Sequence, residues 1–158
     1  MARELLIAWA GRHQSSSWEE ICASYRKRIE RFTPIRDLAV KARVSPDDPQ
    51  RRRTEGESLL ATLPRPAFLV ALDSRGEPFD SAAWARRLDE IRTEWPHAVA
   101  FVLGSDLGLD PAVLKEARLV LSFGPFTLSH ELARVVLYEQ IFRALSMSAG
   151  MSYHREPL

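Results

Sequence analysis

The chain has 158 residues, of which 46% are hydrophobic and 27% are charged, and its formal net charge is +1. This length and composition suit one hydrophobic core, so we expect a single domain over residues 1–158. Cys22 is the only cysteine, so the chain cannot form an internal disulfide, and this cysteine usage is typical of a protein in a reducing cytoplasm. The apolar run at residues 5–10 is too short for a membrane span and lacks the flanks of a signal peptide.

Short apolar runs alternate with amphipathic stretches along the chain. Runs of strand length occupy residues 5–10, 35–42, 67–72, 98–103 and 119–123, and helical patterns occupy residues 18–31, 51–63, 82–92, 111–117 and 129–145. This order predicts an α/β fold with a mostly parallel sheet and helices on both of its faces. Asp110, which precedes Pro111, and Ser129 are predicted to cap the starts of the last two helices.

The small net charge hides a difference between the two parts of the chain. Residues 1–65 carry 13 Lys and Arg against 9 Asp and Glu, whereas residues 66–158 carry 9 against 12. The basic residues are densest in residues 26–31 and 51–53, and both runs could contact the phosphates of a nucleic acid. Runs of this length more often form solvated helix faces, so charge alone leaves both interpretations open.

Three loops that follow predicted strands carry glycine or polar residues, namely residues 72–76, 104–108 and 123–127. Ligands of doubly wound sheets bind beyond the carboxyl ends of the strands, so we expect these loops to meet around one ligand. None of the loops matches a G-x-G-x-x-G or Walker phosphate-binding sequence. The four histidines lack metal-ligand spacing, which predicts no metal site, and the absence of a G-x-S-x-G elbow argues against an α/β-hydrolase.

The last predicted helix has an apolar face that is broad for one neighbouring element, which suggests a partner subunit as a second neighbour. Glu139 and Arg143 have the favourable order for an i, i+4 surface ion pair. Arg134 lies on a more polar sector, where the pattern fits a solvated side chain and a functional one equally well.

Three stretches near the C-terminus are specific enough to compare with known families. They read Phe126-Thr-Leu-Ser-His130-Glu-Leu-Ala-Arg134-Val, Glu139-Gln-Ile-Phe-Arg143-Ala and Tyr153-His-Arg155. Together with the order of elements over the whole chain, they resemble the ribosomal RNA large subunit methyltransferase H family of the SPOUT class. The resemblance implies a C-terminal trefoil knot, a homodimer, and S-adenosyl-L-methionine as the cofactor. It also implies methylation at N3 of a pseudouridine in large-subunit (23S) rRNA on the assembled ribosome.

The resemblance also implies two sets of functional residues by position. The implied catalytic residues are His154, Arg155, Tyr153, His130 and Arg134. The implied cofactor-binding residues are Leu72, Gly104, Ser105, Gly124, Pro125, Phe126, Thr127, Leu128 and Ser129. The chain departs from the family pattern at Ser105, where a second glycine is usual, and at Ser129, where a proline is usual. The extra Cβ of Ser105 would lie where backbone meets cofactor.

The implied reaction moves a methyl group from a sulfonium to an imide nitrogen, so the enzyme must align the two atoms and favour the N3 anion. A nearby cation such as Arg155 lowers the pKa of such a nitrogen, and we expect residues 153–155 to organise the base. The altered 104–108 turn leaves open a ribosome-binding protein of the same fold that has lost turnover. A SPOUT methyltransferase acting on tRNA is disfavoured, because no appended RNA-binding domain is expected.

Overall fold

The structure, a computed structural model, describes residues 3–11, 16–41 and 46–151. Within them, five strands form one parallel sheet in the order β2-β1-β4-β3-β5. The strands are β1 (Leu5–Ala10), β2 (Ile35–Val40), β3 (Ala67–Pro78), β4 (Ala98–Leu103) and β5 (Leu119–Ser122). The α/β fold that the alternating pattern predicts is therefore confirmed.

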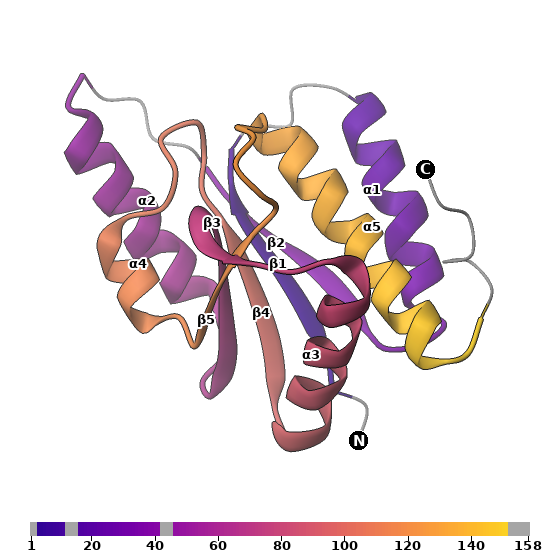
Figure 1. The fold of residues 1–158 in the computed structure, drawn as a ribbon. Coiled ribbons are helices and arrows are strands. Elements are labelled where there is room, and N and C mark those ends of the chain that lie inside the picture. The colour runs from indigo at the N-terminus through magenta and orange to yellow at the C-terminus, as the bar shows by residue number, and fades with distance from the viewer. Residues whose placement is uncertain (1–2, 12–15, 42–45, 152–158) are drawn as a thin grey trace.

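Helices cover both faces of this sheet (Figure 1). On one face lie α1 (Ser16–Ile29), α3 (Ser81–Glu94) and α5 (His130–Ser148), and on the other lie α2 (Asp48–Thr62) and α4 (Pro111–Glu116). Side chains of β1 alternate between two separate hydrophobic clusters, one beneath each helical layer. Both faces of a parallel sheet are thus buried, which explains why β1 and β4 read as continuous apolar runs.

Strand β3 is longer than its apolar run predicts, because it continues past Leu72 to Pro78. Leu72 and Glu77 both pair with Leu121 of β5, so residues 73–76 form a bulge between two paired segments. Polar residues fill this bulge and hide the continuation from a hydrophobicity pattern. The bulge lies at the carboxyl end of the sheet and contributes directly to the pocket described below.

Helix α5 lies between α1 and α3 and also packs on the sheet (Figure 1). Leu137 and Ile141, on its apolar face, are fully buried. Contacts with α1, α3 and the sheet of the same chain thus account for the broad apolar face, which is no longer evidence for a second subunit. The predicted N-caps are confirmed, since Asp110 accepts a hydrogen bond from the Ala112 N–H and Ser129 accepts one from the Leu132 N–H.

Two further predictions concern the chain as a whole. Cys22 is fully buried as a free cysteine, and burial raises the pKa of its thiol, which suits a small apolar residue. None of the helices in the described residues is long and apolar enough to cross a bilayer. The C-terminal trefoil knot and the single domain over residues 1–158 stay predictions.

Candidate functional site

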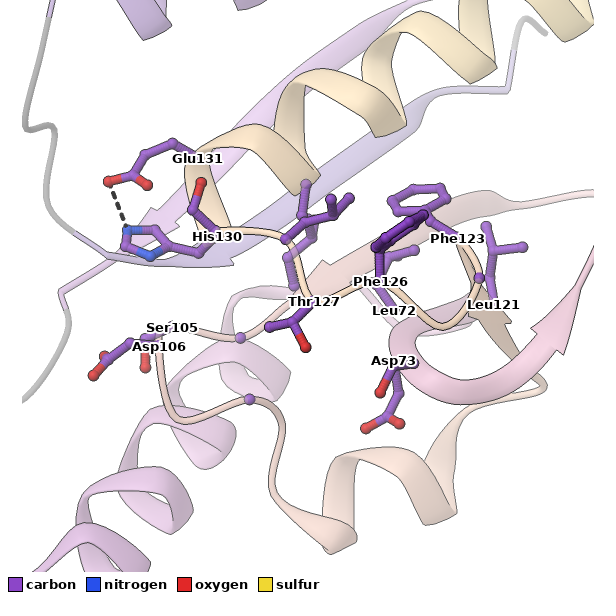
Figure 2. A pocket seen from close by; sticks show the side chains of 18 residues that line it. Leu72, Asp73, Ser105, Asp106, Leu121, Phe123, Phe126, Thr127, His130 and Glu131 are labelled. Carbon is purple, nitrogen blue, oxygen red and sulfur yellow. Dashed lines mark ion pairs between the residues drawn. The ribbon is translucent and has the colours of Figure 1, made fainter.

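A pocket of about 560 Å³ opens at the carboxyl ends of β3, β4 and β5 (Figure 2). The three loops predicted to meet around one ligand all line it, together with the first turn of α5. Of the nine residues implied to bind the cofactor, every one except Pro125 contributes to the lining: Leu72, Gly104, Ser105, Gly124, Phe126, Thr127, Leu128 and Ser129. The expectation that these loops surround one cavity is therefore confirmed.

The first wall of the pocket is the bulge of β3, which contributes Asp73 and Ser74. The Ser122 hydroxyl at the end of β5 donates to the Ser74 carbonyl at 3.1 Å and accepts from the Gly124 N–H at 3.0 Å. Arg75 binds the Asp73 carboxylate, and this hydrogen bond lowers the pKa of Asp73. The carboxylate is therefore held ionised and oriented at the pocket wall, a role that we did not predict from the sequence.

The second wall is the turn after β4. A Cβ on Gly104 would lie 2.4 Å from the carbonyl carbon and oxygen of Gly108, so only glycine permits the turn to fold back this closely. The next residue, Ser105, is buried, and its hydroxyl donates to Glu55 Oε1 on α2 at 2.6 Å. The extra Cβ that distinguishes Ser105 from glycine is thus accommodated.

The third wall is the loop between β5 and α5. Gly124 has a φ of +104°, a backbone conformation that favours glycine and turns the chain over the pocket. Phe126 follows with 82% of its surface exposed, which is unusual for a large apolar side chain beside a cavity. The loop ends at Ser129, the N-cap of α5, so capping fixes the position of the pocket rim relative to the helix.

His130 and Glu131 extend the lining from the loop into α5 (Figure 2). His130 Nε2 is buried and lies 3.2 Å from Glu131 Oε1, and among the described residues it has no partner in hydrogen-bond geometry. The imidazole approaches Gly11 at the end of β1, since a Cβ on Gly11 would lie 3.5 Å from the ring. The structure therefore brings His130 to the pocket together with the cofactor-binding loops.

Arg134 lies outside this lining, in a buried ion-pair cluster beneath α5. Its Nη2 atom lies 2.6 Å from Asp37 and 3.2 Å from Glu19, and its guanidinium lies 4.2 Å from the centre of the Trp9 ring. Asp37 also accepts hydrogen bonds from Arg26 and from the Tyr138 hydroxyl. Burial alone would lower the pKa of Arg134, but the charge of Asp37 raises it, so the guanidinium stays ionised within the cluster.

The remaining implied catalytic residues, Tyr153, His154 and Arg155, lie outside the described residues. The two basic runs prove to be partly engaged within the chain. Arg26 pairs with Asp37 and Glu19, and Arg51 binds Asp106 at 2.7 Å. These two arginines are therefore tied to neighbouring elements, which reduces the charge that either run offers to a polyanion.

The chemistry of the lining indicates the kind of ligand that fits. None of the described residues that line the pocket is Lys or Arg, so the cavity does not match a polyphosphate. It combines apolar walls, backbone groups and three carboxylates, which suits a nucleoside with a cationic group. Its volume is typical of sites for molecules of that size. Among the described residues, no group of three or more His, Cys, Asp or Glu is arranged to hold a metal ion.

Solved structures share this architecture. A probable methyltransferase from Bordetella pertussis Tohama I superposes with a TM-score of 0.57 at 17% identity, covering 91% of this chain and 95% of its own. A probable methylase family protein from Haemophilus influenzae Rd KW20 superposes with a TM-score of 0.54 at 12% identity, covering 98% of this chain and 72% of its own. At such identities these likenesses show the fold alone.

Sequence comparison is more specific. A ribosomal RNA large subunit methyltransferase H from Solidesulfovibrio magneticus is 38% identical over 152 residues, covering 96% of this chain and 99% of the relative. Another from Rhodospirillum centenum is 38% identical over 151 residues, covering 96% and 98%. The family model described as "Predicted SPOUT methyltransferase" matches residues 4–154. A match over this length, supported by relatives of this identity, shows that the chain belongs to the SPOUT methyltransferase family.

Proposed function

We propose that this protein uses S-adenosyl-L-methionine to methylate N3 of a pseudouridine in large-subunit (23S) rRNA on the assembled ribosome, in the cytoplasm. The observation that carries the proposal is the pocket at the carboxyl ends of β3, β4 and β5, built from the loops that the family resemblance assigns to the cofactor. Full-length similarity to relatives named ribosomal RNA large subunit methyltransferase H supports the choice of substrate.

When bound, S-adenosyl-L-methionine supplies a methyl group activated on a sulfonium. The protein's part is to hold the cofactor, exclude water and align the target nitrogen. Backbone groups of residues 124–129 suit contacts with the adenosine, because Gly124 turns the chain there and Ser129 anchors it to α5. The ionised Asp73 suits a hydroxyl or ammonium donor of the cofactor.

For the base, we assign Tyr153, His154 and Arg155 to orientation and to stabilising the N3 anion, with His130 contributing from the pocket wall. Arg134 we assign to supporting the fold, because its guanidinium is held by Asp37 and Glu19 away from the lining. RNA contacts would be mostly to phosphates, and unstacking the target base would cost about a few kcal/mol.

A homodimer is part of the proposal. Its support is exposed apolar surface, since Phe126, which lines the pocket, and Leu132, in the first turn of α5, are 82% and 38% exposed. Exposed apolar surface of this kind is typical of a contact with a ligand or with another protein chain. The state of association can be measured by sedimentation, and the Phe126→Ala variant is expected to shift the equilibrium toward the monomer.

The test begins with calorimetric titration by S-adenosyl-L-methionine, followed by methyl transfer to ribosomes from cells that lack the modification. Free 23S rRNA and tRNA serve as competing substrates, and mass spectrometry of nucleosides identifies the methylated atom. We expect cofactor binding, and transfer to ribosomes alone. The triple variant Tyr153→Ala, His154→Ala, Arg155→Ala should bind the cofactor and lose transfer. Ribosome binding without cofactor binding would instead favour the impaired protein, and transfer to tRNA would contradict the rRNA assignment.

A further inference from the structure

The turn after β4 is tied to α2 by two polar contacts that the proposed reaction does not use. Ser105 donates to Glu55 at 2.6 Å, and Asp106 binds Arg51 at 2.7 Å. Arg51 Nε in turn lies 4.0 Å from Glu55 Oε2, so the two pairs form one cluster. A single face of α2 therefore contacts two consecutive residues of a pocket-lining turn.

The hydrogen bond between Ser105 and Glu55 joins two buried side chains. Glu55 is only 3% exposed and Ser105 only 8% exposed. A buried carboxylate is costly unless donors compensate it, and charge-assisted hydrogen bonds are the strongest available. Ser105 is such a donor. Among the described residues, a Glu55 carboxylate that lost this donor would keep only the more distant Arg51. The orientation of the Ser105 side chain is thus strongly constrained.

Ser105 also organises the rest of the turn. Its carbonyl accepts from the Gly108 N–H at 3.0 Å, and its hydroxyl accepts from the Leu107 N–H at 3.4 Å. The turn therefore closes on Ser105, and Ser105 is held by Glu55. Because Gly104, Ser105, Asp106 and Gly108 all line the pocket, the shape of this wall depends on a contact made behind it.

We propose that Glu55, with Arg51, is a positioning residue that holds the 104–108 turn in its cofactor-binding shape through Ser105. This inference rests on the proposed function, since it concerns the same pocket. It explains how a serine replaces the glycine that is usual at this position: the hydroxyl faces α2 and adds a hydrogen bond that glycine lacks. Glu55 itself is not among the residues that touch the pocket.

The experiment measures the Kd for S-adenosyl-L-methionine by calorimetry and amide hydrogen exchange of residues 104–108 in the unliganded protein. We expect Ser105→Ala and Glu55→Ala each to raise Kd about 10-fold or more, the effect of losing one hydrogen bond to a charged group. Exchange in the turn should quicken in both. Glu55→Gln keeps an acceptor for the serine hydroxyl and should stay within about 3-fold of the parent. The exposed Glu57→Ala on the same helix is the matched control and should change neither quantity.

The double variant Ser105→Ala, Glu55→Ala tests whether the two residues affect cofactor binding through the same hydrogen bond. If they do, the double variant should bind the cofactor no more weakly than whichever single variant binds it less tightly. Variants that melt earlier but keep the parent Kd and the parent exchange rates in the turn would overturn the inference, since Glu55 would then serve stability alone. A parent protein that binds no cofactor would overturn the proposed function and this inference together.

Discussion

Replacing Arg134 by methionine tests whether this residue supports the fold or acts in the reaction. The guanidinium donates to Asp37 at 2.6 Å and to Glu19 at 3.2 Å, and only 5% of the residue is exposed. Removing one partner of a buried ion pair typically costs about 3–5 kcal/mol. Asp37 keeps two donors here, Arg26 and Tyr138, so we expect a loss at or below the lower end of this range, about 2–3 kcal/mol.

The free energy of unfolding is measured by urea titration followed by circular dichroism, which does not depend on the Trp9 ring that Arg134 covers. For a chain of this size the loss corresponds to a fall of about 4–12 °C in melting temperature. The control is Arg87→Met, which breaks a surface pair with Glu90 at 3.5 Å and should cost about 0.5 kcal/mol or less. At a temperature where Arg134→Met is folded, its cofactor Kd should match the parent.

Two outcomes would refute this reasoning. A loss below about 0.5 kcal/mol would mean that the cluster contributes no more than a surface pair does. Alternatively, the variant could keep its stability and lose methyl transfer by about 100-fold or more, a loss typical of catalytic groups. That result would show that Arg134 takes part in the reaction.

Three further predictions concern the pocket and its supports. Gly104→Ala should abolish measurable cofactor binding, because its Cβ would meet the Gly108 backbone at 2.4 Å, and calorimetry checks this. Ser129→Ala removes the N-cap of α5 and should lower the free energy of unfolding by about 1 kcal/mol in urea titration. The pKa of Glu19 is lowered: burial alone would raise it, but the hydrogen bond from Arg26 and the charge of Arg134 outweigh burial. The stabilising contribution of the Glu19 carboxylate is therefore complete above the ordinary pKa of 4.5 and disappears as pH falls through the lowered pKa. The stability difference between the parent and Glu19→Gln should therefore shrink below about pH 4.5 in urea titrations at successive pH values.

The sequence was sufficient to predict where each of the five strands begins and at which edge of the sheet the pocket lies. Apolar runs have strand length at β1 and β4, and both match the observed bounds at residues 5–10 and 98–103. The loops after β3, β4 and β5 meet because parallel strands present their carboxyl ends to one edge. The pocket therefore follows from the order of elements and from where glycine and polar residues fall.

Other features depended on contacts that no local pattern contains. The bulge of β3 is polar, and only its pairing on both sides with Leu121 identifies it as part of a strand. The contact between Glu55 and Ser105 joins residues 50 positions apart, and a glutamate within a helical pattern gives no sign of burial. Asp73 was foreseeable in part, since an acidic residue that directly follows an apolar run of strand length is placed at the functional edge of such a sheet.

The basic runs show most clearly why charge counted along a sequence overstates a binding surface. Arg26 and Arg51 lie in the two densest runs, yet each faces carboxylates brought from other elements, Asp37 on β2 and Asp106 in the turn after β4. A guanidinium held in this way contributes little to binding a phosphate, because the pair would have to break first. Lys27 and Arg53, in the same two runs, are exposed to solvent. An RNA surface on this protein should therefore be sought with charge reversals at these exposed positions, and reversal at Arg26 or Arg51 would report on the fold and the pocket turn instead.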